Sequence, residues 1–115
     1  MQPASTQPVW AVTPEKLDEA VRRLVAGAHP GKIILFGSHS RDRAGKDSDV
    51  DLMVIREEVK DPAAESVRLR RLLKDIVMAV DLVVVSREQY DYWRDTPGNI
   101  FFEAAVEGKV LYEAA

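Results

Sequence analysis

Residues 32–55 read KIILFGSHSRDRAGKDSDVDLMVI, and this stretch decides the fold. It contains two short apolar runs, 32–36 and 52–55, each typical of a buried β-strand. The connection between them, about residues 37–48, is too short for the helical crossover that usually joins parallel neighbours. The sequence therefore predicts an antiparallel pair, in which the second strand begins beside the end of the first.

Four residues at the facing ends of these two strands have the chemistry of a phosphate and metal site. Gly37 and Ser38 follow the first strand, where a glycine permits close backbone approach and turn N–H groups can bind an anion. Asp49 and Asp51 are two positions apart, so in an extended segment both carboxylates point to one face. Two such charges repel unless a cation lies between them, and Mg²⁺ typically binds carboxylates together with substrate phosphates. The pattern predicts a metal-dependent nucleotide site, although an ordinary turn and an exposed strand cap remain alternatives.

A third carboxylate, Asp81, is expected at the same edge of the sheet. It lies in the β-branched run 80–85, which is typical of a strand covered on both faces. A helix over 63–78 would join this strand to the preceding one as a right-handed parallel crossover, so that both strands begin at one edge. Exposure of Asp81 at the start of its strand is the alternative.

The remaining elements complete an α/β chain with a small mixed sheet packed with helices. A cap and proline at Thr13 and Pro14 predict a helix that ends before the first strand. Ser86 predicts the cap of a short helix ending near Trp93, and Thr96 with Pro97 predicts the beginning of the next one.

Gly108 is expected to end that last helix, and residues 110–112 to form a short edge strand. Residues 1–12 are polar and proline-rich and are predicted to be a flexible arm. Residues 13–115 would then form one domain.

Composition narrows the possible functions. With 115 residues the chain has room for one core but not for a second substrate domain. The absence of cysteine excludes a disulfide framework, a thiolate zinc site and a cysteine nucleophile. A net charge of −3 argues against strong nucleic-acid binding. No apolar run is long enough to span a membrane or resembles a signal peptide, so we expect a cytoplasmic protein.

The motifs resemble those of the DNA polymerase β-like nucleotidyltransferase superfamily, and most closely its minimal nucleotidyltransferases. The resemblance rests on Gly37-Ser38, Asp49-x-Asp51 and the later strand aspartate Asp81, together with Arg41 in a Gly-Ser-x-x-Arg pattern and the closing segment 100–113. It implies a nucleotidyltransferase fold in which Gly37, Ser38 and Arg41 hold the triphosphate of ATP. Asp49, Asp51 and Asp81 would hold two magnesium ions, with Asp81 also activating the attacking hydroxyl. Asp42 departs from the glycine usual at its position.

The resemblance also implies a reaction and a partner. Minimal nucleotidyltransferases resemble antitoxins that transfer AMP from ATP to a tyrosine of a helical HEPN-type ribonuclease toxin. The short chain would need an acceptor surface from such a partner or from a second copy of itself, so a homo-oligomer is possible. Transfer to a small molecule such as an aminoglycoside, and a catalytically weak protein-binding module, are the alternatives.

Overall fold

A computed structural model of the chain describes residues 9–37 and 50–115. Its sheet has four strands in the order β3-β2-β1-β4. As predicted, β1 and β2 are antiparallel while β2 and β3 are parallel, and β4 adds to the other edge of β1 as an antiparallel strand. The sheet is therefore mixed, and its strands are β1 (Lys32–Gly37), β2 (Val50–Arg56), β3 (Val80–Ser86) and β4 (Lys109–Glu113).

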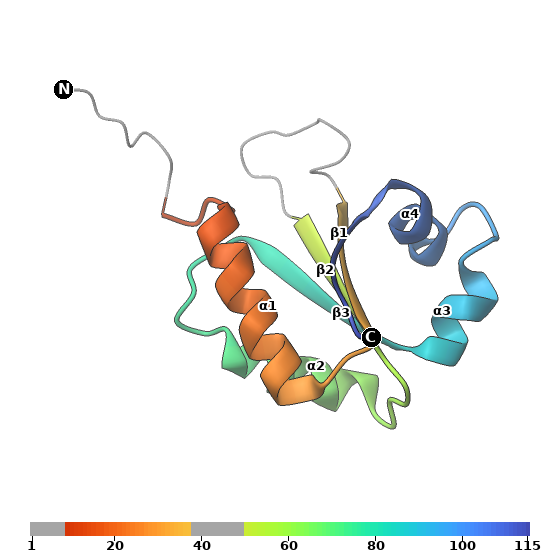
Figure 1. Cartoon of the computed structure of the whole chain (residues 1–115), viewed down its shortest axis with the longest axis horizontal. Helices are drawn as coiled ribbons and strands as arrows, with labels where there is room; N and C mark the ends of the chain where they lie inside the picture. Colours follow the sequence, from red (N-terminus) through yellow and green to blue (C-terminus); the bar gives the residue numbers. More distant parts are fainter. Residues whose placement is uncertain (1–8, 38–49) are drawn as a thin grey trace.

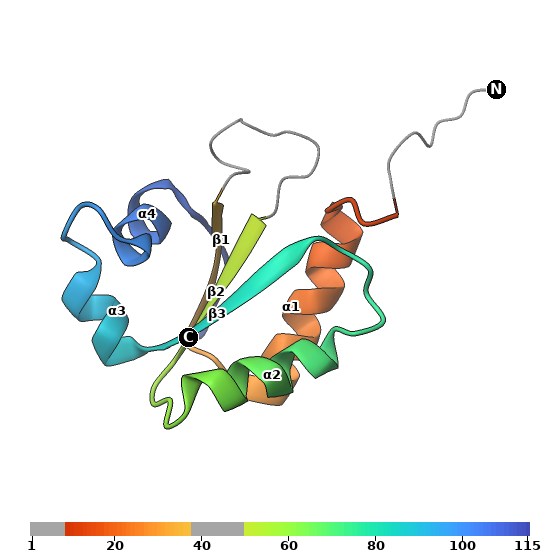
Figure 2. The same ribbon diagram turned by 180° about the vertical axis from the view of Figure 1, so that it is seen from behind.

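Helices cover both faces of the sheet (Figure 1). The helices α1 (Pro14–Ala28) and α2 (Pro62–Leu72) lie on one face. The shorter helices α3 (Arg87–Trp93) and α4 (Ile100–Glu107) lie on the other. Figure 2 shows the same layers from behind, with α2 continuing into β3 at one edge.

Alternation along β1, β2 and β3 produces two apolar clusters. On the α1–α2 side, Leu24 and Leu69 pack against strand residues such as Leu35 and Leu52. The alternate strand residues point to the other face of the sheet and pack against α3 and α4. The buried members of this second cluster are Ile34, Phe36, Met53, Ile55, Val85, Tyr90 and Ala104. Because neighbouring residues of a strand serve opposite faces, the face of any strand residue follows from its register.

Two of the four helix caps, Thr13 and Ser86, are those that the sequence predicts, and Asp61 caps α2. The side chains of Thr13, Asp61 and Ser86 accept hydrogen bonds from the backbone N–H groups of Lys16, Ala64 and Gln89 at 3.1–3.2 Å. Each satisfies a donor that the first helical turn leaves without an intrahelical partner.

Two predicted helix boundaries are wrong. The crossover helix ends at Leu72 rather than 78, because Leu73 and Lys74 donate to carbonyls three residues back and the chain then turns toward β3. The later helix begins at Ile100 and is capped by Asn99, not by Thr96. Asn99 accepts from the N–H groups of Phe101 and Phe102, at 2.8 and 3.0 Å, and its amide donates to the Thr96 carbonyl. One asparagine thus forms both the cap and the turn.

The residues just before α1 are attached to the domain by hydrogen bonds. Lys16 Nζ donates to the carbonyls of Val9 and Ala11, and the N–H of Ala79 donates to the carbonyl of Trp10. Residues 1–8 lie outside the described part of the chain, so the flexible arm over 1–12 and the domain limit at 13 stay predictions.

None of the helices in residues 9–37 and 50–115 combines the length and the apolar character needed to cross a bilayer.

The junction between α4 and β4 should tolerate no side chain at Gly108. A Cβ there would collide with the Ala104 carbonyl oxygen and with Ile34 Cγ2, whereas a Cβ at Gly31 would meet its nearest atom at 3.8 Å. We expect Gly108→Ala to lower the free energy of unfolding by about 1–3 kcal/mol, as overpacking does. Gly31→Ala is the matched control and should change it by less than about 0.5 kcal/mol. Urea denaturation measures both, and equal effects would contradict this account of the junction.

Candidate functional site

The end of β1 is shaped by a contact between its last residue and the adjoining strand. Gly37 is buried with φ +107°, a left-handed conformation that side chains other than glycine rarely adopt. An ideal Cβ on Gly37 would lie 2.5 Å from Oδ2 of Asp51 and 3.4 Å from the Asp51 backbone nitrogen. The Asp51 carboxylate therefore occupies the space that a side chain at residue 37 would need, and it lies against the backbone where β1 ends.

The sheet register places a second carboxylate beside the first. Phe36 on β1 and Asp81 on β3 both pair with Asp51 across the sheet. Val50 and Leu52 belong to the α1–α2 cluster, so the residue between them points to the α3–α4 face, and Asp81 does so by the same alternation. Asp51 and Asp81 thus share one face and one end of the sheet, as the sequence predicted.

Among the described residues, no helix covers this end of the face at Asp81. α4 lies over β1. α3 begins directly after the last residue of β3, whereas Asp81 lies near the first residue of that strand. The Asp81 side chain is 57% exposed, while Asp51 is half-buried. The expectation that β3 is covered on both faces is wrong at Asp81, because β3 is an edge strand and the Asp81 side chain is exposed near its start.

In the described part of the chain, an arginine borders Asp81. Arg70, near the end of α2, has Nη2 4.0 Å from Oδ1 of Asp81. Both side chains are about half exposed, so solvent screens the pair and its contribution to stability is small, less than about 1 kcal/mol. Arg70 thus offsets part of the negative charge at this edge without burying Asp81.

The structure brings together three of the six residues that the sequence singled out. Gly37, Asp51 and Asp81 meet at one end of the sheet. Ser38, Arg41 and Asp49 fall within 38–49, outside the described residues. Their roles stay predictions.

The donor set at this end suits a hard cation. Two carboxylates on one face, neither fully buried, are typical of Mg²⁺ ligands that leave room for water and phosphate oxygens. Within residues 9–37 and 50–115, no three acidic, histidine or cysteine side chains form a group able to hold a metal ion. Asp51 and Asp81 therefore fit part of a magnesium site, for which the sequence predicts Asp49 as the third carboxylate.

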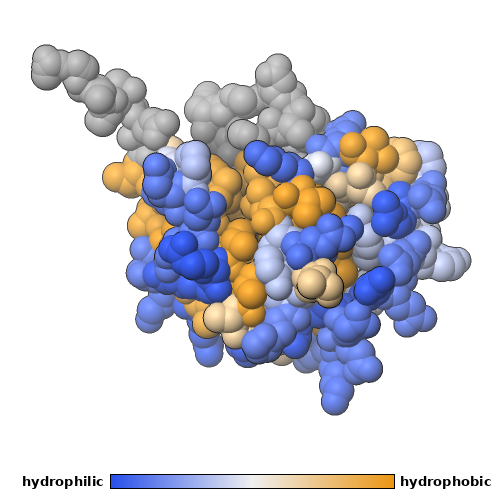
Figure 3. Space-filling view, viewed as in Figure 1, coloured by the Kyte–Doolittle hydropathy of each residue, from blue (hydrophilic) through white to orange (hydrophobic). Residues whose placement is uncertain are grey.

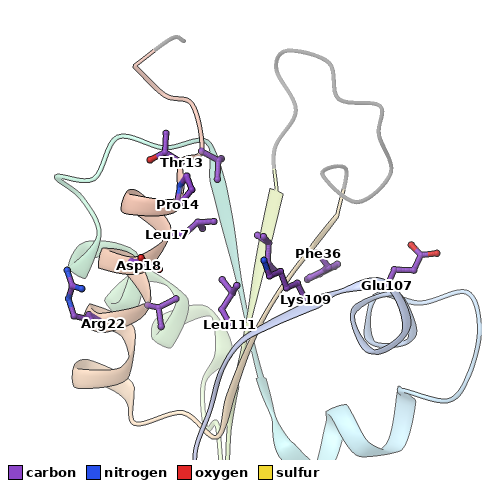
Figure 4. Close-up of a pocket in the computed structure, with 12 residues that line it drawn as sticks. Thr13, Pro14, Leu17, Asp18, Arg22, Phe36, Glu107, Lys109 and Leu111 are labelled. Atoms are coloured by element: carbon purple, nitrogen blue, oxygen red, sulfur yellow. The ribbon is translucent and has the colours of Figure 1, made fainter. Parts of the chain in front are cut away.

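Sequence reasoning missed a pocket next to this end of the sheet. The pocket has a volume of about 590 Å³ and lies between α1 and the β1–β4 edge (Figure 4). Leu35 and Phe36, the two residues before Gly37, both line it. Its other walls come from α1 and β4, which are distant in sequence, so no local motif marks it.

Comparisons with known proteins agree with this fold. Residues 14–107 match the family model of the nucleotidyltransferase domain. None of the curated proteins matches the chain significantly.

Three solved structures share the fold. A protein from Sulfolobus solfataricus, provisionally described as a nucleotidyltransferase, aligns with a TM-score of 0.61 at 16% identity, over 86% of this chain and 78% of that one. A toxin–antitoxin complex with AMP-PNP aligns at 0.56 and 23% identity, over 84% and 73%. A mutant of the toxin–antitoxin complex MntA–HpeT aligns at 0.55 and 22% identity, over 90% and 74%. At these identities the three structures support the fold alone.

The contact between Gly37 and Asp51 gives a stability prediction. Gly37→Ala should lower the free energy of unfolding by about 2 kcal/mol, because the new Cβ meets Oδ2 of Asp51 and the backbone conformation is strained. In an Asp51→Ala background the steric part is relieved, so the same change should cost at least about 0.5 kcal/mol less. Urea denaturation of the four proteins measures this coupling, and additive effects would contradict the contact.

Asp81→Asn should leave the protein without metal as stable as the wild type or slightly more stable. The change relieves repulsion with Asp51 and loses only the screened pair with Arg70. Thermal melts in chelator measure it. A large loss of stability would instead identify Asp81 as a structural carboxylate.

Proposed function

Because the chain belongs to the nucleotidyltransferase domain family, we propose that it is a metal-dependent enzyme that transfers AMP from ATP to a protein hydroxyl. One observation carries the proposal: the Asp51 carboxylate lies against the buried Gly37 backbone, with Asp81 beside it in register at an open end of the sheet. This arrangement places two carboxylates that can bind a cation next to the end of β1.

The glycine end of β1 binds the triphosphate. The missing side chain at Gly37 leaves room for the Asp51 carboxylate at the end of β1, next to the predicted phosphate-binding turn. Ser38 and Arg41 supply a hydroxyl and a guanidinium to the same phosphates, since Arg is well suited to oxyanions. Asp42 next to Arg41 adds a negative charge that works against this binding.

Asp49, Asp51 and Asp81 are the residues that hold magnesium. Mg²⁺ supplies the positive charge that neutralises the polyphosphate and acidifies the attacking hydroxyl. The carboxylates orient the ions, and the fixed register of β2 and β3 maintains their spacing. Asp81, the more exposed of the two described carboxylates, faces the side from which an acceptor can approach.

The reaction is a substitution at the α-phosphorus of ATP. The acceptor oxygen forms a new bond to that phosphorus, and the bond from the phosphorus to the bridging oxygen of pyrophosphate breaks. Pyrophosphate leaves with the electron pair of that bond, and Asp81 accepts the hydroxyl proton. No residue of the chain becomes covalently modified.

The acceptor is a tyrosine of a helical HEPN-type toxin, so that the protein acts as an antitoxin. Support comes from the resemblance to minimal nucleotidyltransferases and from two structural neighbours that are toxin–antitoxin complexes, one of them with AMP-PNP. The edge strand β3, with Asp81 exposed near its start, leaves room for a partner surface. Association with a second copy of the chain would be a further way to complete the acceptor side.

Incubation with a HEPN-type toxin, ATP and magnesium should add the mass of one AMP to a toxin tyrosine, as mass spectrometry of the toxin would show. Asp81→Asn should reduce the transfer rate by about 10²–10⁴-fold, the usual cost of removing a general base, while sparing much of the ATP affinity. The matched control is Asp95→Asn, an exposed aspartate after α3, which should leave the rate unchanged.

Three results would contradict the proposal. Equal ATP affinity in chelator and in magnesium, measured by calorimetry, would exclude metal-dependent binding. Modification of a small molecule such as an aminoglycoside, but not of the toxin, would change the acceptor class. Neutralisation of the toxin with no release of pyrophosphate would identify a binding module rather than an enzyme.

A further inference from the structure

The two edges of the sheet differ in how they are protected against pairing with another chain. An edge strand presents unpaired N–H and C=O groups, and proteins usually protect it with a short strand, charged residues or a bulge. β4 has all three features. It has five residues, and it begins with Lys109 and ends with Glu113. Its pairing with β1 also shifts in register between Ile33 and Ile34, as at a bulge.

β3, at the other edge, lacks this protection. Its sequence VDLVVVS is apolar apart from Asp81 and Ser86, and it pairs with β2 without a register shift. Within residues 9–37 and 50–115, β2 is the strand that pairs with β3, so the backbone groups along the other side of β3 have no ladder. Figure 2 shows β3 as the outermost strand on that side of the molecule. A strand of another chain can therefore be added beside β3.

A strand added beside β3 would extend the row that carries the carboxylates. Phe36, Asp51 and Asp81 pair in one row across β1, β2 and β3. A residue of the added strand that pairs with Asp81 would lie in this row and point to the same face of the sheet. Neighbouring strands are about 4.8 Å apart, so its side chain can reach the Asp81 carboxylate, which is 57% exposed.

Cations at the end of α2 indicate the charge of such a segment. Arg70 reaches the beginning of β3, and Arg71 and Lys74 follow it as exposed side chains. The nearby Asp75 is already paired with Arg23. Although the chain as a whole has a net charge of −3, this end of α2 therefore favours a segment with acidic residues.

We propose that the free edge of β3 docks an extended, acidic segment of the protein that accepts AMP, as an added strand that brings the acceptor tyrosine beside Asp81. The inference rests on the proposed function, and it adds the surface and the backbone conformation by which the acceptor is recognised. Main-chain hydrogen bonds to β3 supply affinity, and the register with Asp81 selects the residue that is modified. Arg70 and Arg71 contact acidic side chains of the segment.

Hydrogen exchange at the two edges of the sheet tests the docking directly. The probe is a HEPN-type toxin whose acceptor tyrosine is replaced by phenylalanine, so that its complex with the chain, ATP and magnesium stays unmodified. Binding should slow amide exchange in residues 80–86 and leave residues 109–113, the matched edge, unchanged.

The hollow between α1 and β4 is the rival surface for the same partner, because Figure 3 shows apolar surface gathered there. Slower exchange in residues 109–113 but not in 80–86 would place the partner on that hollow and overturn the inference.

Val83→Lys places a charge in the middle of the free edge. Val83 lies between Leu82 and Val84 of the α1–α2 cluster, so it points to the α3–α4 face, where it is partly buried. Because a lysine on an edge strand opposes pairing, the variant should bind the toxin at least about tenfold more weakly, the equivalent of one or two lost backbone hydrogen bonds. Val110→Lys, on the protected edge and 48% exposed, is the matched control and should keep wild-type affinity.

A thermal melt shows whether Val83→Lys folds, and if it does not, the exchange measurement on the wild type decides. Transfer of AMP to the native toxin with no change of exchange in residues 80–86 would overturn the inference and leave the proposed function standing. A chain that dimerises alone, with residues 80–86 protected in the absence of toxin, would identify a second copy as the occupant and also overturn it. Protection of residues 80–86 without AMP transfer to the native toxin would support the docking edge and overturn the proposed enzyme. Neither binding nor transfer would overturn both.

Discussion

The register between three strands is the constraint on which the site depends. Asp51 pairs with Phe36 on one side and with Asp81 on the other, so a single row across the sheet carries both carboxylates. The row lies one residue from the end of β1, where Gly37 leaves space for the Asp51 side chain. The buried residues on each face fix this register, because a slip would expose one apolar cluster and bury charges in the other.

The carboxylates are positioned to be charged and accessible at the same time. A fully buried aspartate would become protonated or need a permanent partner. Asp51 is half-buried against the backbone of Gly37, and the exposed Asp81 on an edge strand has a solvent-screened contact with Arg70. The site thus retains two charged carboxylates without a large desolvation cost on folding. A cation can bind to them without a rearrangement of the two strands.

Much of this could be predicted from the sequence because the determining signals are local. The short connection after the first strand indicates an antiparallel pair, and the helical crossover indicates a parallel one; together they bring Gly37, Asp51 and Asp81 to one end. The errors occur where tertiary context overrides a local signal. Thr96 and Pro97 form a plausible cap, but Asn99 bonds to both the turn and the helix and so sets the boundary. The exposure of Asp81 depends on strand order, which the β-branched composition of its segment does not reveal, and the α1–β4 pocket joins elements far apart in sequence.

The pairing of Asp51 with Phe36 has a consequence for how such a chain can vary in evolution. An insertion or deletion of one residue inside β2 would turn Asp51 to the α1–α2 face and remove it from Asp81, since side chains alternate along a strand. We therefore expect β2 to be kept free of gaps among homologues. Alignments that place a gap between Val50 and Arg56 would misassign the carboxylate.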